Sequence, residues 1–369
     1  MKHTPLFMQH QQLGGKLVDF AGWEMPIQYG GVIEEYQAVR RAAGLFDVSH
    51  MGRVSVEGRE AETFLQRVTT NNVARLAVGD AQYSMVCNPS GSIKDDIFIY
   101  RLGATRFLVC VNASNRDTIV SWLFQKAPQG DIRLSDESDE MAQIALQGPH
   151  SQEILRVVCP AVADTLTPKH CVETDVLGAS GIVARTGYTG EIGYEFYVPS
   201  HKAVAVWERL LLAGKTVGIK ACGLGSRDLL RLEVGYLLYG NDMDEQTTPL
   251  EAGAAFVVDF TKGDFIGRQA LLEQKAKGPA KKLVAFELLQ TGVPRHGMNI
   301  LADGQGAGSE DRIGVVTSGN LSPRLQKGIG LGYVPGAFSA LGSSFQIDIR
   351  GRLHQAVVVK LPFYKRTAA

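Results

Sequence analysis

The sequence lacks an excess of charge of either sign, and it lacks long hydrophobic runs. Its 369 residues include 38 Lys and Arg and 38 Asp and Glu, so the formal net charge is zero. A balanced chain has no broad electrostatic attraction for nucleic acid or for an anionic membrane surface. No apolar run approaches the roughly 20 residues of a transmembrane helix, and residues 1–6 lack the apolar stretch of a secretory signal. We therefore expect a cytoplasmic protein that binds neither nucleic acid nor a membrane.

Cysteine is scarce and histidine is scattered. The five cysteines are widely spaced, include no Cys-x-x-Cys pair and lie mostly in apolar runs, as Cys110 does. Buried reduced thiols are therefore a better interpretation than disulfides or metal ligands. The eight histidines include no His-x-x-x-His spacing, so we predict no metal site.

Nucleotide-binding fingerprints are missing as well. The nearest match is residues 185–195, Arg-Thr-Gly-Tyr-Thr-Gly-Glu-Ile-Gly-Tyr-Glu, in which glycines recur at every third position. This segment has neither a Gly-Lys-Ser/Thr ending nor a Gly-x-Gly-x-x-Gly order, and its carboxylates would repel phosphate. A plain hairpin loop and a tight polar loop over a neutral or cationic ligand both remain open, whereas a nucleotide site is excluded.

The chain does contain two similar passages of strands and helices. We expect the first to have strands at 53–56, 82–87, 93–100 and 106–112, and helices at 60–68 and 115–125. We expect the second to have strands at 142–147, 171–175, 181–185 and 194–198, and helices at 151–157 and 202–212. This order predicts two α+β modules with antiparallel sheets.

The last third of the chain has a different pattern. After a helix expected at 223–236 and a polar linker at 275–282, short strands are punctuated by glycines. Their expected positions are 283–288, 313–317, 327–333, 344–349 and 354–360. Short, evenly spaced strands with turn residues predict a small β-barrel or sandwich.

Two clusters of charged residues stand out as chemical candidates. Asp95 and Asp96 are adjacent in an apolar strand, so a regular strand turns their side chains to opposite faces. Such a pair can end a hairpin strand at the surface, or one of the two can face the interior. Arg227 and Arg231 share a helix face, where either a bound carboxylate or an internal acidic partner would hold an arginine. Residues 241–245, Asn-Asp-Met-Asp-Glu, are typical of a solvated acidic loop.

Taken in order, these and other segments resemble the glycine cleavage T-protein family. The resemblance begins with Val-Asp-Phe-Ala-Gly-Trp-Glu-Met-Pro at 18–26 and Gly-Leu-Phe-Asp-Val-Ser-His-Met-Gly at 44–52. It continues through residues 95–96, 147–149, 185–191, 223–228, 237–244, 262–267, 317–323 and 362–365. The resemblance therefore covers nearly the whole chain, and no single short motif carries it.

The resemblance implies an α+β fold of three domains in a cloverleaf around a central folate cavity. It assigns residues 1–50 with 138–245 to the first α+β module, 51–137 to the second with 246–278 packed against it, and 280–369 to a C-terminal β-barrel. It implies an aminomethyltransferase that takes an aminomethyl group from the lipoyl arm of H-protein. Tetrahydrofolate is the co-substrate, with no metal and no nucleotide, and the products are 5,10-methylenetetrahydrofolate, ammonia and the reduced arm.

The resemblance also implies roles for individual residues. Asp96 would be the acidic catalytic group near the reacting folate nitrogens, and Glu195 would pair with the N–H edge of the pterin. Arg227 would be a cavity arginine, and Lys365, or Arg366 in its place, would contact the glutamate tail of the folate. The residues expected to line the pterin ring and the aminobenzoate are Tyr83, Met51, Asn112, Tyr188 and Tyr236.

Other activities share this fold. A tetrahydrofolate-dependent demethylase would use a similar cavity, but Asp96 and the full-length match favour aminomethyl transfer. The folate-binding domain of an amine oxidase is normally fused to a flavin domain, for which no fingerprint is present. Non-enzymatic iron–sulfur-assembly relatives carry a cysteine where Asp264 stands, which argues against a pure folate-binding role. A structural or tRNA-associated folate protein would show a basic face, which net charge neither supports nor excludes.

Overall fold

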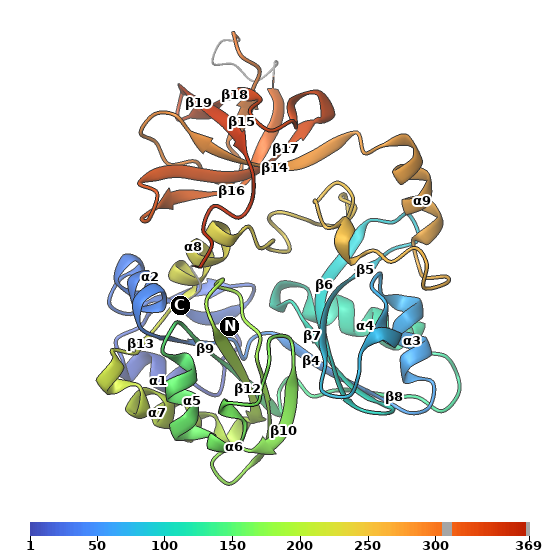
Figure 1. Ribbon diagram of the computed structural model, residues 1–369, viewed down its shortest axis with the longest axis vertical. Helices are drawn as coiled ribbons and strands as arrows, with labels where there is room; N and C mark the ends of the chain where they lie inside the picture. Colours follow the sequence, from blue (N-terminus) through green and yellow to red (C-terminus); the bar gives the residue numbers. More distant parts are fainter. Residues whose placement is uncertain (305–311, 367–369) are drawn as a thin grey trace. The chain divides into compact units, whose positions relative to one another are not determined.

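The computed structural model describes residues 1–304 and 312–366. The chain divides into two compact units (Figure 1). The first comprises Met1–Val86 and Asp95–Asp228, and the second comprises Cys87–Lys94 and Leu229–Ala369. No helix in the described residues is long and apolar enough to cross a membrane.

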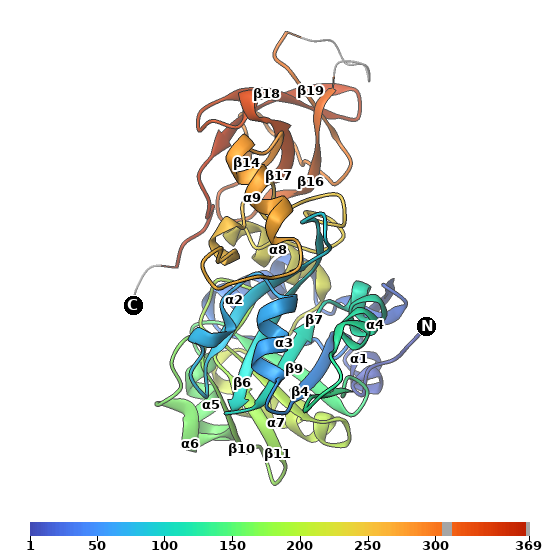
Figure 2. The same ribbon diagram turned by 90° about the vertical axis from the view of Figure 1, so that its right-hand side faces the viewer.

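One sheet of the first unit has five strands in the order β5-β6-β7-β4-β8. These are β4 (Gly52–Glu57), β5 (Ala81–Cys87), β6 (Ile93–Gly103), β7 (Arg106–Val111) and β8 (Arg133–Asp136). Helices α3 (Ala61–Val68) and α4 (Arg116–Lys126) lie along this sheet in both views (Figures 1 and 2). Helix α3 buries Ala61, Phe64, Leu65 and Val68, the i, i+3, i+4, i+7 spacing of an amphipathic helix.

The second sheet of this unit has six strands in the order β10-β11-β12-β9-β3-β13. These are β3 (Gly44–Asp47), β9 (Met141–Gln147), β10 (Cys171–Asp175), β11 (Ser180–Ala184), β12 (Gly193–Pro199) and β13 (Lys220–Ala221). All neighbours are antiparallel except β13 and β3, which are parallel. Helices α5 (Ser151–Val158), α6 (Pro160–Ala163) and α7 (Ala203–Ala213) contribute to its apolar core.

An apolar layer joins the two sheets of the first unit. Tyr100, Leu108 and Cys110 come from the five-stranded sheet, and they pack against Ile182 and Tyr197 of the six-stranded sheet. The inner faces of the two predicted modules are therefore turned toward each other. The predicted helices and strands of both passages are confirmed, with bounds that shift by at most three residues.

The N-terminal elements were not expected from the sequence. They are α1 (Phe7–Gln12), β1 (Lys16–Phe20), β2 (Trp23–Gln28) and α2 (Val32–Arg41). Buried Asp47 of β3 fixes this segment, since it accepts bonds from Thr4 Oγ1 at 2.6 Å and His10 Nε2 at 2.9 Å. Burial alone would raise the pKa of Asp47, but the bonds from His10, Ser49 and Thr4 lower it to about 2. Asp47 thus serves as an ionised anchor for the chain start.

The second unit contains a closed barrel with the strand order β14-β17-β16-β15-β18-β19. These are β14 (Lys281–Leu288), β15 (Asn299–Leu301), β16 (Arg312–Ser322), β17 (Lys327–Pro335), β18 (Ser344–Ile349) and β19 (Arg352–Val359). The fold class, α+β with antiparallel sheets and a C-terminal barrel, is thus confirmed. The predicted linker at 275–282 is wrong in extent, because α9 (Arg268–Lys277) continues to 277 and β14 begins at 281.

The three-way domain division stays a prediction. All five cysteines are free and buried, as expected.

Helix α8 (Leu224–Val234) begins in the first unit and ends in the second. In the second unit, Arg231 is fully buried and donates from Nη1 to Asp242 Oδ2 at 2.6 Å and from Nη2 to Ser318 Oγ at 2.7 Å. The expectation of a solvated acidic loop is therefore wrong at Asp242, which is completely buried. Thr317 also donates to this carboxylate, so the pair is fully hydrogen-bonded, as a buried charge pair must be.

We expect Arg231→Met to destabilise the chain by about 3–5 kcal/mol, because it leaves the buried Asp242 charge without its partner. The measurement is the free energy of unfolding in a denaturant titration. Lys327→Met is the matched control, since the side chain of Lys327 is 52% exposed in its pair with Glu287. The control should cost no more than about 1 kcal/mol, and equal losses in both variants would contradict this account.

Candidate active site

Asp95 and Asp96 are both held inside the first unit. Along β6 the side chains alternate, so Asp95 is fully buried on one face and Asp96 is half-buried on the other. Asn112 follows the neighbouring strand β7 and reaches both, because its Nδ2 lies 2.9 Å from Asp95 Oδ1 and 2.6 Å from Asp96 Oδ1. Its backbone N–H also donates to Asp95 Oδ2 at 3.1 Å. The pair is therefore not a surface feature at the end of a hairpin.

The second oxygen of Asp96 has a donor of its own. Tyr83 on β5 donates its hydroxyl to Asp96 Oδ2 at 2.9 Å. Burial, followed by the charge of Asp96, raises the pKa of Tyr83 well above its usual value, so the phenol stays protonated. Hydrogen bonds from Tyr83 and Asn112 thus fix the plane of the Asp96 carboxylate.

Asp95 stands in a less favourable environment for charge. Burial, and then the neighbouring charge of Asp96, raises the pKa of Asp95 well above its ordinary value despite the bonds from Asn112. The neighbouring Lys94 does not offset this, since its Nζ lies 2.8 Å from Glu245 Oε1. Asp95 therefore supports Asn112 from the inner face of the strand.

Glu195 on β12 is the centre of a second polar network. It accepts a bond from Gln143 Nε2 at 3.1 Å, a short bond from Thr186 Oγ1 and a longer one from the Tyr100 hydroxyl at 3.4 Å. The Tyr197 hydroxyl donates to that of Tyr100 at 2.8 Å. Glu195 is only 8% exposed, and neutral amide and hydroxyl groups form its direct hydrogen bonds.

Arg227 brings a positive charge to this network. Its guanidinium lies 4.7 Å from the centre of the Tyr188 ring, a cation–π geometry. Burial lowers the pKa of Arg227, and the negative charge of Glu195 partly offsets the effect. Its Nη1 is buried without a hydrogen-bond partner in the described structure, so it offers an unused donor beside Glu195.

The crossover between β3 and β4 carries Met51, with His50 before it. Met51 packs in the apolar layer that also contains Tyr100 and Tyr197. Burial lowers the pKa of His50 to about 4, with Arg227 and Arg53 adding to the effect. His50 is therefore neutral near pH 7 and is no acid–base candidate in the free protein.

The chain has been compared with known proteins. A family model described as the GCVT N-terminal domain matches residues 6–262, and one described as the glycine cleavage T-protein C-terminal barrel domain matches residues 281–365.

The chain belongs to the glycine cleavage T-protein family.

Individual relatives match along their whole length. An aminomethyltransferase of Halothermothrix orenii is 48% identical over 363 residues, which cover 98% of this chain and 100% of that protein. The aminomethyltransferase of Bacillus subtilis is 43% identical over 368 residues, which cover 99% of this chain and 100% of that protein. The crystal structure of glycine cleavage system aminomethyltransferase T from Bartonella henselae has a TM-score of 0.92 at 33% identity, covering 99% of this chain and 98% of that one.

The residues predicted from the family resemblance fall into two sets. The first unit holds most of them. Hydrogen bonds link Asp96 with Tyr83 and Asn112. The Arg227 guanidinium contacts the Tyr188 ring and feels the charge of Glu195, while Met51 packs in the apolar layer. Tyr236 and Lys365 belong to the second unit, where Tyr236 is 42% exposed and Lys365 is exposed. Their place in a folate site stays a prediction, as do the roles of the others.

Arg53 was missed, although the family segment at 44–52 ends beside it. Its guanidinium is fully buried and donates to the carbonyl oxygens of Ser49, Met51, Ser138 and Met141. It therefore holds both crossovers between the two sheets of the first unit, and with them Met51. An arginine alternating with Val54 and Val56 is typical of a solvent-facing strand position, so nothing local signalled its burial. Among the described residues, no group of three or more His, Cys, Asp or Glu residues could hold a metal ion.

The raised pKa of Asp95 has a measurable consequence for stability. Above the ordinary Asp value of 3.8 the folded chain binds more protons at Asp95 than the unfolded chain does. The stability that Asp95 contributes to the folded chain is therefore complete below pH 3.8. It is lost as the pH rises through the raised pKa of Asp95. We expect the free energy of unfolding, relative to that of Asp95→Asn, to fall as the pH rises above the ordinary Asp value.

Asp131→Asn is the control for this titration. Asp131 is exposed and pairs with Arg59, which lowers the pKa of Asp131. The free energy of unfolding, relative to that of Asp131→Asn, should therefore not fall as the pH rises. A flat or rising difference for Asp95→Asn would contradict the assignment of a buried, reluctantly ionised carboxyl.

Proposed function

We propose that this protein is the aminomethyltransferase of the glycine cleavage system. It would move the one-carbon unit from the aminomethyl-lipoyl arm of H-protein to tetrahydrofolate in the cytoplasm. The observation that carries the proposal is the Asp96 carboxylate, held by Tyr83 and Asn112 in the same unit as the Glu195 network. Family membership over nearly the whole chain supports the same reaction.

The Glu195 network fits the polar edge of a reduced pterin. Adjacent N–H donors on such a ring need a carboxylate that accepts them together, and Glu195 is oriented for that by Thr186 and Gln143. The unused Nη1 of Arg227 offers a donor to a carbonyl oxygen beside it. Tyr188, Met51 and Tyr83 supply flat or apolar surfaces for the rings. Tyr236 and Lys365 stay predicted contacts of the aminobenzoate and the glutamate tail.

Asp96 would act by charge and by proton handling. In the overall transfer, two carbon–nitrogen bonds form to the folate nitrogens, while the carbon's bonds to the lipoyl sulfur and to the amine break. The two protons that leave the folate nitrogens end on the sulfur and on the departing ammonia. The transferred carbon becomes iminium-like on the way, and a fixed carboxylate stabilises that positive charge and can accept or relay one of the protons. Tyr83 and Asn112 hold the carboxylate so that it does not have to reorient.

We expect Asp96→Asn to lower turnover by about 10²–10⁴-fold, because it removes the charge and the proton acceptor but keeps the hydrogen-bonding shape. The measurement is tetrahydrofolate-dependent ammonia release from aminomethyl-loaded H-protein. Asp164→Asn, an exposed aspartate paired with Arg156, is the matched control and should keep normal turnover. Near-normal turnover of Asp96→Asn would remove Asp96 from the mechanism. Failure of the unaltered chain, together with demethylation of a methylamine donor, would favour the demethylase.

We expect Glu195→Gln to weaken tetrahydrofolate binding by about 10–100-fold, the loss of one charge-assisted hydrogen-bonded contact. The amide keeps an oxygen for Thr186, so the fold should be retained. Binding is followed by tryptophan and tyrosine fluorescence, with circular dichroism as the check on folding. Unchanged affinity in a folded Glu195→Gln protein would place the pterin elsewhere.

A further inference from the structure

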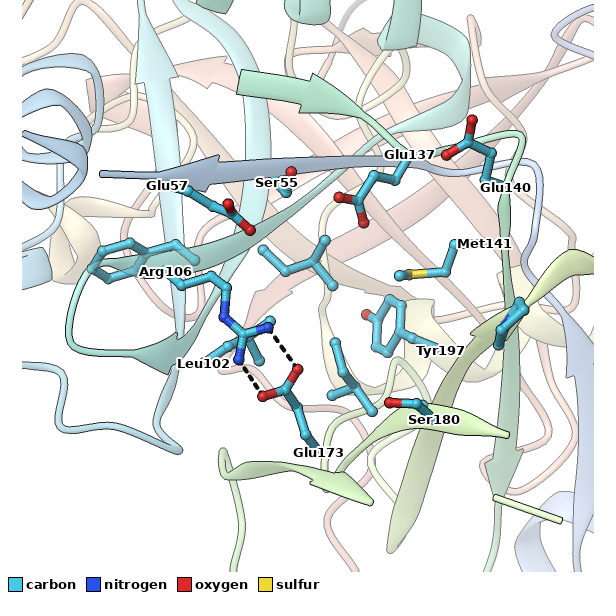
Figure 3. A pocket seen from close by; sticks show the side chains of 15 residues that line it. Ser55, Glu57, Leu102, Arg106, Glu137, Glu140, Met141, Glu173, Ser180 and Tyr197 are labelled. Carbon is cyan, nitrogen blue, oxygen red and sulfur yellow. Dashed lines mark hydrogen bonds and ion pairs between the residues drawn. The ribbon is translucent and has the colours of Figure 1, made fainter. Parts of the chain in front are cut away.

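A cavity of about 240 Å³ lies between the two sheets of the first unit and is open to solvent at Arg106 and Glu173 (Figure 3). At a share of roughly 30 Å³ per water molecule, it has room for about eight waters or a small organic molecule. It is separate from the groups assigned above to folate, with one exception. The ring of Tyr197 lines this cavity, whereas the hydroxyl of Tyr197 belongs to the Glu195 network.

The strand register explains how the cavity is lined. On β4, Ser55 and Glu57 point to the same face, and their antiparallel partners on β7 are Leu108 and Arg106. Partners in an antiparallel pair share a face, so one level of this wall combines Ser55 with Leu108 and the next combines Glu57 with Arg106. The other wall comes from the second sheet, where Ile182 pairs with Tyr197. The cavity therefore has two largely apolar walls that carry isolated polar groups.

Negative charge predominates among these polar groups. Four glutamates and one arginine line the cavity: Glu57, Glu137, Glu140, Glu173 and Arg106. Glu173 accepts hydrogen bonds from Nη1 and Nη2 of Arg106, as the dashed lines in Figure 3 show. Glu57 pairs with Arg133 at 2.6 Å. Within residues 1–304 and 312–366, the Glu137 and Glu140 side chains form no hydrogen bond or direct ion pair. The Arg106 charge still acts on Glu137, and Glu140 is exposed, so Glu137 is the carboxylate that a ligand in the cavity would use.

Ser55 provides a second, independent sign of a bound group. Its side chain points into the cavity (Figure 3), and the residue is only 8% exposed. Its hydroxyl has no hydrogen-bond partner in the part of the chain that the structure describes. A ligand that can hydrogen-bond to the Ser55 hydroxyl would therefore gain a contact that the described residues do not supply.

We propose that this cavity binds a small organic ammonium ion with an apolar body. The ammonium group, which carries three donors and no acceptor, bonds to the Glu137 carboxylate and to Ser55 Oγ. The apolar body packs against Leu108, Ile182 and Tyr197. Anions are repelled by the excess of glutamates over arginine, and a bare metal ion would find apolar side chains where it needs further oxygen ligands. This inference is independent of the proposed aminomethyl transfer.

The test is a charge series of one shape, titrated into the full-length chain: butylammonium, 1-butanol and butyrate. Binding is followed by NMR of the methionine methyl groups, since Met141 lines the cavity. We expect a saturable shift of the Met141 methyl signal with butylammonium, binding at least about tenfold weaker with butanol, and none with butyrate. Absence of a saturable shift, or equal binding of butanol and butylammonium, would overturn the proposal.

Two variants locate the site, and a third serves as the control. Glu137→Gln and Ser55→Val should each raise the dissociation constant of butylammonium about tenfold or more. Glu208→Gln makes the same chemical change at an exposed position on α7, outside the cavity, and should leave the constant unchanged. An equal effect of Glu208→Gln would show that the chain's general charge, and not this cavity, attracts the cation, and would refute the site. Because the charge series uses the unaltered chain, it decides the matter even if a variant fails to fold.

Discussion

A carboxylate that enters a protein interior must be held by hydrogen bonds, and this constraint shapes the first unit. Asp96 and Glu195 are both fixed by amide and hydroxyl donors: Asn112 and Tyr83 for one, Gln143, Thr186 and Tyr100 for the other. Such donors set the direction of a carboxylate without cancelling its charge, in contrast to a direct ion pair. The charge is then available to a ligand, which is what a cationic transition state and a pterin N–H edge require.

The chain handles its other buried charges differently, and the contrast separates structural groups from chemical ones. Arg231 and Asp242 neutralise each other in the second unit, and Arg53 gives its donors to main-chain carbonyls. Arg227 belongs with the chemical groups, because Tyr188 and the Glu195 charge hold it while its Nη1 keeps an unused donor. An internal charge with unused hydrogen-bonding capacity is thus the feature that the two proposed sites share.

Much of this arrangement could be predicted from the sequence, and the physical reasons for success and failure differ. Strand alternation and turn residues placed β5, β6 and β7 within a few residues, because these signals are local. Local signals also put Asp95 and Asp96 on opposite faces, but they could not show that Asn112 would reach both. Arg227 and Arg231 look alike in the helix pattern, and only pairing with the distant Asp242 and Ser318 separates them. The burial of Arg53 was missed for the same reason, since two of its four partners, Ser138 and Met141, lie more than 80 residues away in sequence.

A crystal structure with tetrahydrofolate bound would show whether the oriented carboxylates of the first unit face the ligand. We expect the Glu195 oxygens to lie about 2.7–3.1 Å from two adjacent pterin N–H groups. We also expect Asp96 to face the reacting folate nitrogens while it keeps its bonds to Tyr83 and Asn112. A pterin bound away from Glu195, or an Asp96 carboxylate turned away from the folate, would contradict this expectation.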